Sequence, residues 1–195
     1  MNNNTKKLVY TALIAACYAA LTMVLAPISY GVLQFRISEV FCVLPFFFTP
    51  AAAGLTIGCI IANVMSAAGM LDIVFGSLAT LLAGLCTAAI GTRARRALLA
   101  GNSDAVIKNG AEKKAASIGW GSCLAACAMP VLFNAPIVGA VLSYAFSENG
   151  FWQGFVIFGA QVGISEAVVM FALGLPLMRY LLKSSFLNSF IKNLL

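Results

Sequence analysis

Long apolar runs alternate with short polar segments along this chain. Apart from Glu166, charged side chains are absent from five runs: 8–35, 40–71, 73–92, 115–147 and 150–178. A membrane helix needs about 20 residues, and prolines within the longer runs mark breaks. The pattern predicts six transmembrane helices in a single membrane domain, residues 1–195. Their expected bounds are 8–26, 37–49, 51–68, 71–92, 115–134 with a broken extension through Pro130 and Pro136 to 146, and 150–182.

The composition supports a membrane solvent. Hydrophobic residues make up 62% of the 195 positions and charged residues only 9%. Soluble domains have about 25% charged residues, and a chain of this length cannot hide so much apolar surface in one core. These values exclude an independent water-soluble fold and a disordered chain. We therefore expect an all-α integral membrane protein.

The positions of the cations predict the topology. Lys6 and Lys7 precede the first apolar run, and six of the twelve cations lie in a polar segment at 93–114. Cationic loops stay in the cytoplasm, so an even number of crossings must separate these two segments. The run at 40–71, which could be one crossing or two, is then a hairpin. Arg179, Lys183 and Lys192 favour a cytoplasmic C-terminus as well, with 93–114 as a cytoplasmic loop.

This topology places several polar side chains toward the outer face of the membrane. Glu166 falls near the middle of the last apolar run, where an ionisable group is costly and marks a functional site by default. We expect a pocket for a small polar ligand, formed by Glu166, Asn134, Asp72, Glu39, Arg36, Gln34, Asn63, Phe35 and Tyr30. Structural alternatives remain open for three of them. Glu166 or Glu39 could pair with Arg36, and Asp72 could cap the fourth helix.

Other kinds of chemistry find no support in the sequence. The chain has no histidine and no Gly-Lys pair, so a histidine base and a Walker-type ATP loop are excluded. The six cysteines lie inside apolar runs and are interpreted as packing residues. We expect no catalytic residues, no metal, no cofactor and no nucleic-acid partner. Energy for any active process must come from another protein.

Small residues recur every fourth position on the first helix. The two ridges are Ala12, Ala16 and Ala20, and next to them Ala15 and Ala19. Small side chains let membrane helices approach closely. Two adjacent ridges exceed what one internal neighbour needs, which suggests that a partner protein docks on this helix.

Six separated motifs resemble the QueT family. They are APISYG at 26–31, QFRISE at 34–39, GCIIAN at 58–63, LDIVFG at 71–76 with LATL at 78–81, FNAPIVG at 133–139 and LGLP at 173–176. The resemblance covers roughly residues 8–180. Ser165, before Glu166, departs from the expected glycine.

The resemblance implies a role in transport. Members are substrate-binding S-components of energy-coupling factor (ECF) transporters of the bacterial cytoplasmic membrane, assigned to queuosine precursors such as 7-deazaguanines. They have six helices, bind substrate near the extracellular side and dock a transmembrane coupling subunit through alanine-rich ridges. Two cytoplasmic ATPases drive that subunit.

Two other functions remain open from the sequence. The chain could be an S-component or a stand-alone carrier for another vitamin-like molecule. It could instead be a membrane enzyme that uses paired carboxylates, although the absence of histidine argues against this.

Overall fold

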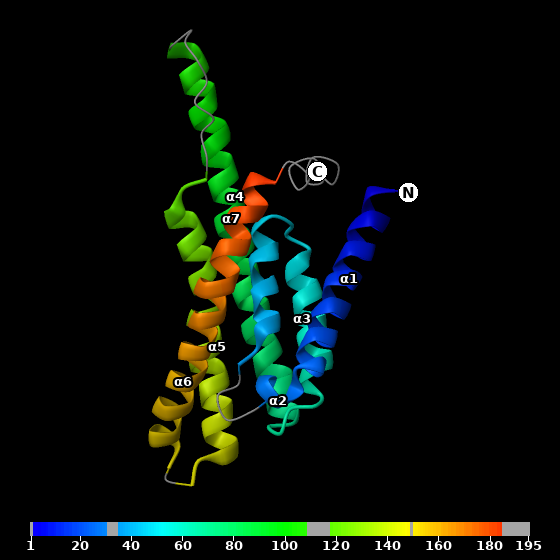
Figure 1. Cartoon of the computed structure of the whole chain (residues 1–195), viewed down its shortest axis with the longest axis vertical. Helices are drawn as coiled ribbons and strands as arrows, with labels where there is room; N and C mark the ends of the chain where they lie inside the picture. The colour runs from blue at the N-terminus through cyan, green and yellow to red at the C-terminus, as the bar shows by residue number, and fades with distance from the viewer. Residues whose placement is uncertain (1, 31–34, 109–117, 149, 185–195) are drawn as a thin grey trace.

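Helices packed side by side make up the structure, a computed structural model that describes residues 2–30, 35–108, 118–148 and 150–184 (Figure 1). All elements in these ranges are helical. In chain order they are α1 (Asn3–Val24), α2 (Ala26–Ser29), η1 (Ile37–Phe46), α3 (Ala51–Asn63), η2 (Asp72–Gly76), α4 (Ser77–Lys108), α5 (Trp120–Phe146), α6 (Phe151–Val168), η3 (Val169–Gly174) and α7 (Leu175–Lys183). η1 is a 3₁₀-helix, whereas η2 and η3 are π-helical turns. η2 continues into α4, and η3 links α6 to α7.

Four helical segments are long and apolar enough to cross a membrane. They are Asn3–Val24, Asp72–Leu98, Trp120–Phe146 and Phe151–Lys183. The expected all-α membrane class is confirmed at this level. The other two apolar helices are shorter, with 10 residues in η1 and 13 in α3. The larger rise of a 3₁₀-helix makes both about 20 Å long.

The structure differs from the expected break in the fifth helix. α5 runs without interruption from Trp120 to Phe146 although Pro130 and Pro136 lie inside it. Pro130 has no N–H, so it cannot donate to the carbonyl of Ala126 four residues earlier. The hydroxyl of Thr87 on α4 donates to that carbonyl instead, at 3.3 Å. A neighbouring helix thus satisfies the group that the proline leaves unpaired.

Two other helices end at different places from those expected. α4 continues beyond residue 92 to Lys108, into the segment expected to be a loop. α3 ends at Asn63 rather than at residue 68, and the turn that follows passes through Gly69 with φ of 61°. Only glycine adopts this conformation readily, which explains the sharp turn toward η2. Figure 1 shows α1 beginning and α7 ending at the same end of the bundle.

An apolar core fills the bundle between η1, α5 and the segment formed by η3 and α7. We use the name apolar core for the buried residues Tyr18, Cys42, Val43, Phe46, Phe47, Leu55, Cys59, Ala62, Cys123, Ala126, Cys127, Met170 and Met178. Helix packing around this core is close. A Cβ at Gly91 would overlap the carbonyl oxygen of Phe46. A Cβ at Gly58 would lie 2.7 Å from the carbonyl oxygen of Ala15, so α3 contacts α1 backbone to backbone.

Candidate functional site

Six buried polar side chains are linked by hydrogen bonds, an ion pair and electrostatic interactions. We call Arg36, Glu39, Asn63, Asp72, Asn134 and Glu166 the polar cluster, and each is less than 9% exposed. Five elements supply them, because Arg36 directly precedes η1 and Glu39 lies in it, while the others come from α3, η2, α5 and α6. Buried polar groups are costly in a membrane protein and are retained mainly where they function.

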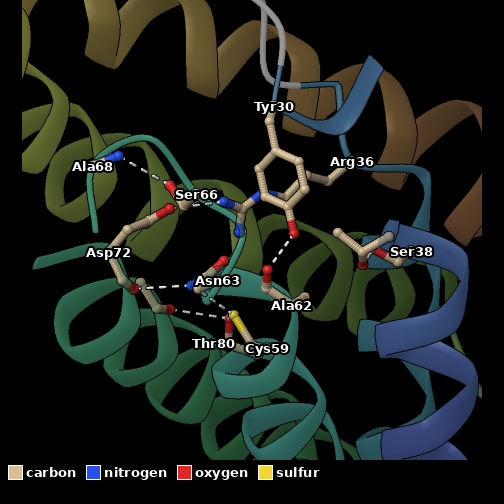
Figure 2. Close-up of polar contacts among 12 residues, drawn as sticks. Tyr30, Arg36, Ser38, Cys59, Ala62, Asn63, Ser66, Ala68, Asp72 and Thr80 are labelled. Carbon is tan, nitrogen blue, oxygen red and sulfur yellow. Dashed lines mark hydrogen bonds and ion pairs between the residues drawn. The ribbon is translucent and has the colours of Figure 1, made fainter. Parts of the chain in front are cut away.

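Arg36 and Asp72 form an ion pair inside the protein. Arg36 Nη2 donates to Asp72 Oδ2 at 3.1 Å, and the two side chains are 8% and 0% exposed. Figure 2 shows the guanidinium beside the ring of Tyr30, with 5.7 Å between the Arg36 Cζ atom and the ring centroid. The ion pair decides between the alternatives left open by the sequence. Arg36 pairs with Asp72 across 36 residues of sequence rather than with Glu39 or Glu166.

Asn63 holds the backbone of the π-helical turn that carries Asp72. Its Nδ2 donates to the Asp72 carbonyl oxygen at 2.9 Å (Figure 2). Gly76 makes room for this arrangement. A Cβ there would lie 2.6 Å from Asp72 Oδ1 and 2.9 Å from Asn63 Nδ2. π-helical turns are rare and occur often at functional sites.

Glu39 is held by two donors. Tyr18 Oη donates to Glu39 Oε1 at 2.5 Å, and Cys42 Sγ donates to Oε2 at 2.9 Å. Each carboxylate oxygen therefore has a partner. Thr22 and Ser38 form a further hydrogen bond of 2.6 Å nearby, which ties α1 to η1.

Among the described residues, Glu166 has neither the cationic partner that Asp72 has nor the donor on each oxygen that Glu39 has. Asn134 forms a side-chain hydrogen bond with it, and its charged neighbours are Glu39 and Arg36. Its Oε1 is buried and makes no hydrogen bond among the described residues. The side chain is 6% exposed and lies one turn before the π-helical turn η3.

The expected aromatic residues lie at the edge of the cluster. Tyr30 Oη donates to the Ala62 carbonyl at 2.5 Å (Figure 2). Burial raises the pKa of the Tyr30 phenol, so it remains a donor at neutral pH. Phe35 is half-buried and its backbone N–H bonds to Ile28. Gln34, also expected in the site, lies outside the described residues.

Several buried polar atoms of the cluster have no protein partner within the described ranges. They are Arg36 Nε, Asn63 Oδ1, Asp72 Oδ1 and Glu166 Oε1. Unpaired buried polar atoms cost about 1–3 kcal/mol each, and a polar ligand that bonds them recovers this cost. No group of three potential metal ligands occurs in the described part of the chain. The arrangement therefore fits a small molecule with several hydrogen-bonding groups.

Sequence reasoning missed the residues that support the site. Tyr18 and Cys42 hold Glu39, and Gly76 leaves space for Asp72 and Asn63. A tyrosine between two alanine ridges is a weak signal in the sequence, because its hydroxyl needs a buried acceptor. Cys42 and Gly76 carry no such signal.

A hollow beside the cluster is apolar. It has a volume of about 530 Å³ and is lined by Leu71, Phe75, Pro136, Ile137, Ala140, Val141 and Tyr144. Apart from the exposed Tyr144, these side chains have no polar group. The hollow offers few hydrogen-bonding groups, in contrast to the unpaired atoms of the cluster.

Comparison with known proteins agrees with the family suggested by the motifs. The family model described as QueT transporter matches residues 8–183. The queuosine precursor transporter QueT of Lactococcus lactis subsp. cremoris (strain MG1363) is 40% identical over 82 residues. That match covers 41% of this chain and 48% of the relative, about half its length. No solved structure matches the chain.

Proposed function

The chain belongs to the QueT transporter family, and from its polar cluster we propose that it is the substrate-binding S-component of an ECF importer. The family is one of transporters rather than enzymes. The sequence has no Gly-Lys pair for a Walker-type loop, so partner subunits would supply ATP hydrolysis. The observation that carries the proposal is a buried polar cluster with four unpaired atoms, in a chain without histidine.

We propose a queuosine precursor as the ligand. The Lactococcus lactis relative is named as a transporter of such compounds. A 7-deazaguanine presents ring N–H and amino donors and a carbonyl acceptor. Asn63 and Asp72 offer acceptors and Arg36 offers a donor, so the cluster complements this mixture. Tyr30 and Phe35 lie where an aromatic ring could stack on the base.

We propose six crossings with both termini in the cytoplasm of a bacterial cell. η1 and α3 would form the second and third crossings, each completed by the residues that flank it. α1 begins and α7 ends at the same end of the bundle, which supports an even number of crossings (Figure 1). Eleven of the twelve cations then lie on the cytoplasmic side.

Cysteine labelling tests this topology. Ser103→Cys should react with a membrane-impermeant maleimide only after the cells are opened, and Glu148→Cys should react in intact cells. The chain with its native cysteines alone gives the background. Labelling of both positions from the same side would exclude the six-helix topology.

The partner surface that we propose is one face of α1. Ala12, Ala16 and Ala20 are exposed, whereas Ala15 and Ala19 are each 5% exposed and face the bundle. This division supports docking of the transmembrane coupling subunit on the exposed ridge, because small side chains permit close helix contact. Two cytoplasmic ATPases would drive that subunit. Ala15 and Ala19 then serve internal packing against α3.

Ligand binding by the purified chain tests the function directly. Titration of the detergent-solubilised protein with 7-deazaguanines should show saturable binding without chemical change of the ligand. Guanine and a vitamin such as riboflavin serve as controls. Binding of the vitamin but of no deazaguanine would contradict the proposed substrate class, and turnover of a bound compound would contradict an S-component.

A further inference from the structure

The unpaired atoms of the polar cluster fall into two chemically different sets. One set contains a donor, Arg36 Nε, and two acceptors, Asn63 Oδ1 and Asp72 Oδ1. The Asn63 amide is neutral, and the negative charge of Asp72 is paired with Arg36. The other is a single carboxylate oxygen, Glu166 Oε1. The two sets come from different parts of the chain, since the first lies around η1, α3 and η2 and the second lies on α6. A ligand that bonds both sets must present two different kinds of group.

The first set matches a neutral edge. The charge of Asp72 is compensated by Arg36 at 3.1 Å, so its second oxygen needs a donor rather than a cation. Asn63 uses its amide nitrogen on the Asp72 carbonyl, which leaves only its oxygen for a ligand. One donor beside two acceptors is complementary to a carbonyl beside two N–H groups. That is the pattern along the pyrimidinone edge of a deazaguanine.

Glu166 stands apart because, among the described residues, it has neither a cation bonded to it nor a donor on each oxygen. Glu39 has a donor on each oxygen, and Asp72 has the guanidinium. Glu166 has the Asn134 amide on one side and an unpaired oxygen on the other, and Arg36 is already engaged by Asp72. With one oxygen free it cannot accept two parallel bonds from a ring edge. A single ammonium group satisfies both its charge and its geometry.

The charge of the whole cluster points in the same direction. One guanidinium and three carboxylates give a formal charge of +1 − 3 = −2 when all are ionised. Buried charges of one sign repel each other strongly where water is excluded. A cationic ligand reduces the excess, whereas a neutral ligand leaves it unchanged and also removes water from around it.

We propose that Glu166 binds an ammonium group on the ligand, so that the site selects deazaguanines with a protonated aminomethyl substituent over those with a neutral nitrile. This inference rests on the proposed function, since both compounds are queuosine precursors. It names the ligand group that each part of the cluster binds. Glu166 is the specificity-determining residue, and the set around Asn63 and Asp72 binds the part that the two compounds share.

The test uses two ligands that share their ring and differ in the charge of one substituent. 7-Aminomethyl-7-deazaguanine should bind the purified chain about tenfold to a hundredfold more tightly than 7-cyano-7-deazaguanine, the range expected for one charge-assisted hydrogen bond. Glu166→Gln should weaken binding of the amine at least tenfold and change binding of the nitrile less than threefold. Glu148→Gln removes an exposed carboxylate outside the cluster and should leave both affinities unchanged.

Each outcome separates this inference from the function on which it rests. Equal binding of the two compounds by the unmodified chain overturns the role of Glu166 but leaves transport of deazaguanines standing. Equal losses for both compounds in Glu166→Gln would place Glu166 at the shared ring and also overturn it. Binding of neither compound overturns the proposed function itself. If Glu166→Gln does not fold, Glu166→Asp, which keeps the charge, must retain the preference for the amine.

Discussion

In the polar cluster Arg36 and Asp72 are buried as an ion pair, whereas in the apolar core Cys123 and Met178 are buried only against apolar side chains and backbone. Both regions exclude solvent to the same extent. They differ in what remains unsatisfied. The polar cluster retains unpaired atoms that a ligand can bond, while the apolar core is filled by close contacts such as Gly91 against Phe46. Substitutions in the cluster should therefore affect binding as well as stability. Those in the part of the core that makes no hydrogen bond to the cluster, away from Tyr18, Cys42 and Cys59, should affect stability alone.

The largest effect is expected at the ion pair. Asp72→Asn leaves the Arg36 guanidinium buried without a counter-charge, so the free energy of unfolding should fall by about 3–5 kcal/mol. Thermal melting of the purified protein in detergent measures the loss. The double variant Arg36→Gln/Asp72→Asn should recover most of it. An unchanged melting temperature in the single variant would mean that water reaches Arg36 freely.

The next effect is expected in the apolar core. Gly91→Ala would place a methyl group against the Phe46 carbonyl, which is backbone and cannot move aside, and should cost about 2–3 kcal/mol. Ligand affinity of the folded fraction should stay within threefold. Gly121→Ala is the matched control, because nothing lies within 4 Å of that position. A loss of affinity in Gly91→Ala would show that the two regions are not independent.

A smaller effect on stability is expected at Gly76, with a larger effect on binding. A Cβ there meets the ends of the Asp72 and Asn63 side chains, which can shift. We expect a loss of about 1 kcal/mol in stability from this overpacking, but a loss of ligand affinity of tenfold or more because both acceptors move. Titration and melting curves on Gly76→Ala measure the two quantities. Loss of stability without loss of affinity would remove this part of the cluster from the site.

The smallest effect on stability is expected on the exposed face of α1. Ala16→Leu should change the free energy of unfolding by less than about 0.5 kcal/mol and leave binding intact, since the residue is exposed. It should block uptake by cells. Ala15→Leu, one position earlier and buried against α3, should instead destabilise the protein. Normal uptake by Ala16→Leu would refute the proposed docking surface.

The sequence predicted which residues form the polar cluster better than it predicted which carboxylate pairs with Arg36. Ionisable residues within apolar runs are few, so Glu166, Asp72 and Arg36 could be selected from composition and topology alone. The partner of Arg36 could not, because Asp72, Glu39 and Glu166 were all within reach of a folded bundle. Only the packing of η1 against α1, α3 and α4 brings Arg36 to Asp72 and leaves Glu39 to Tyr18.

Helix positions were predicted best where the apolar pattern is uninterrupted. The last helical segment, Phe151–Lys183, follows the expected 150–182 closely, whereas α1 begins at Asn3 rather than at residue 8. The continuity of α5 through two prolines depends on Thr87, a residue of another helix. The same limit applies to α1, whose two alanine ridges look alike in sequence. Their different exposure arises from the position of α3, with Gly54 and Gly58 against Thr11 and Ala15.

The hydrogen bond from Thr87 to the Ala126 carbonyl has a consequence for how the bundle can move. Ordinary apolar helix contacts allow small sliding along the helix axis, since one set of contacts replaces another. A directional bond to a carbonyl that its own helix cannot satisfy fixes the axial register of α4 against α5. Asp72 begins the helical segment that continues as α4, and Asn134 lies near the middle of α5. The bond thereby holds the two side chains at a constant relative height. During any tilting of the protein in the membrane, α4 and α5 should move as one rigid unit.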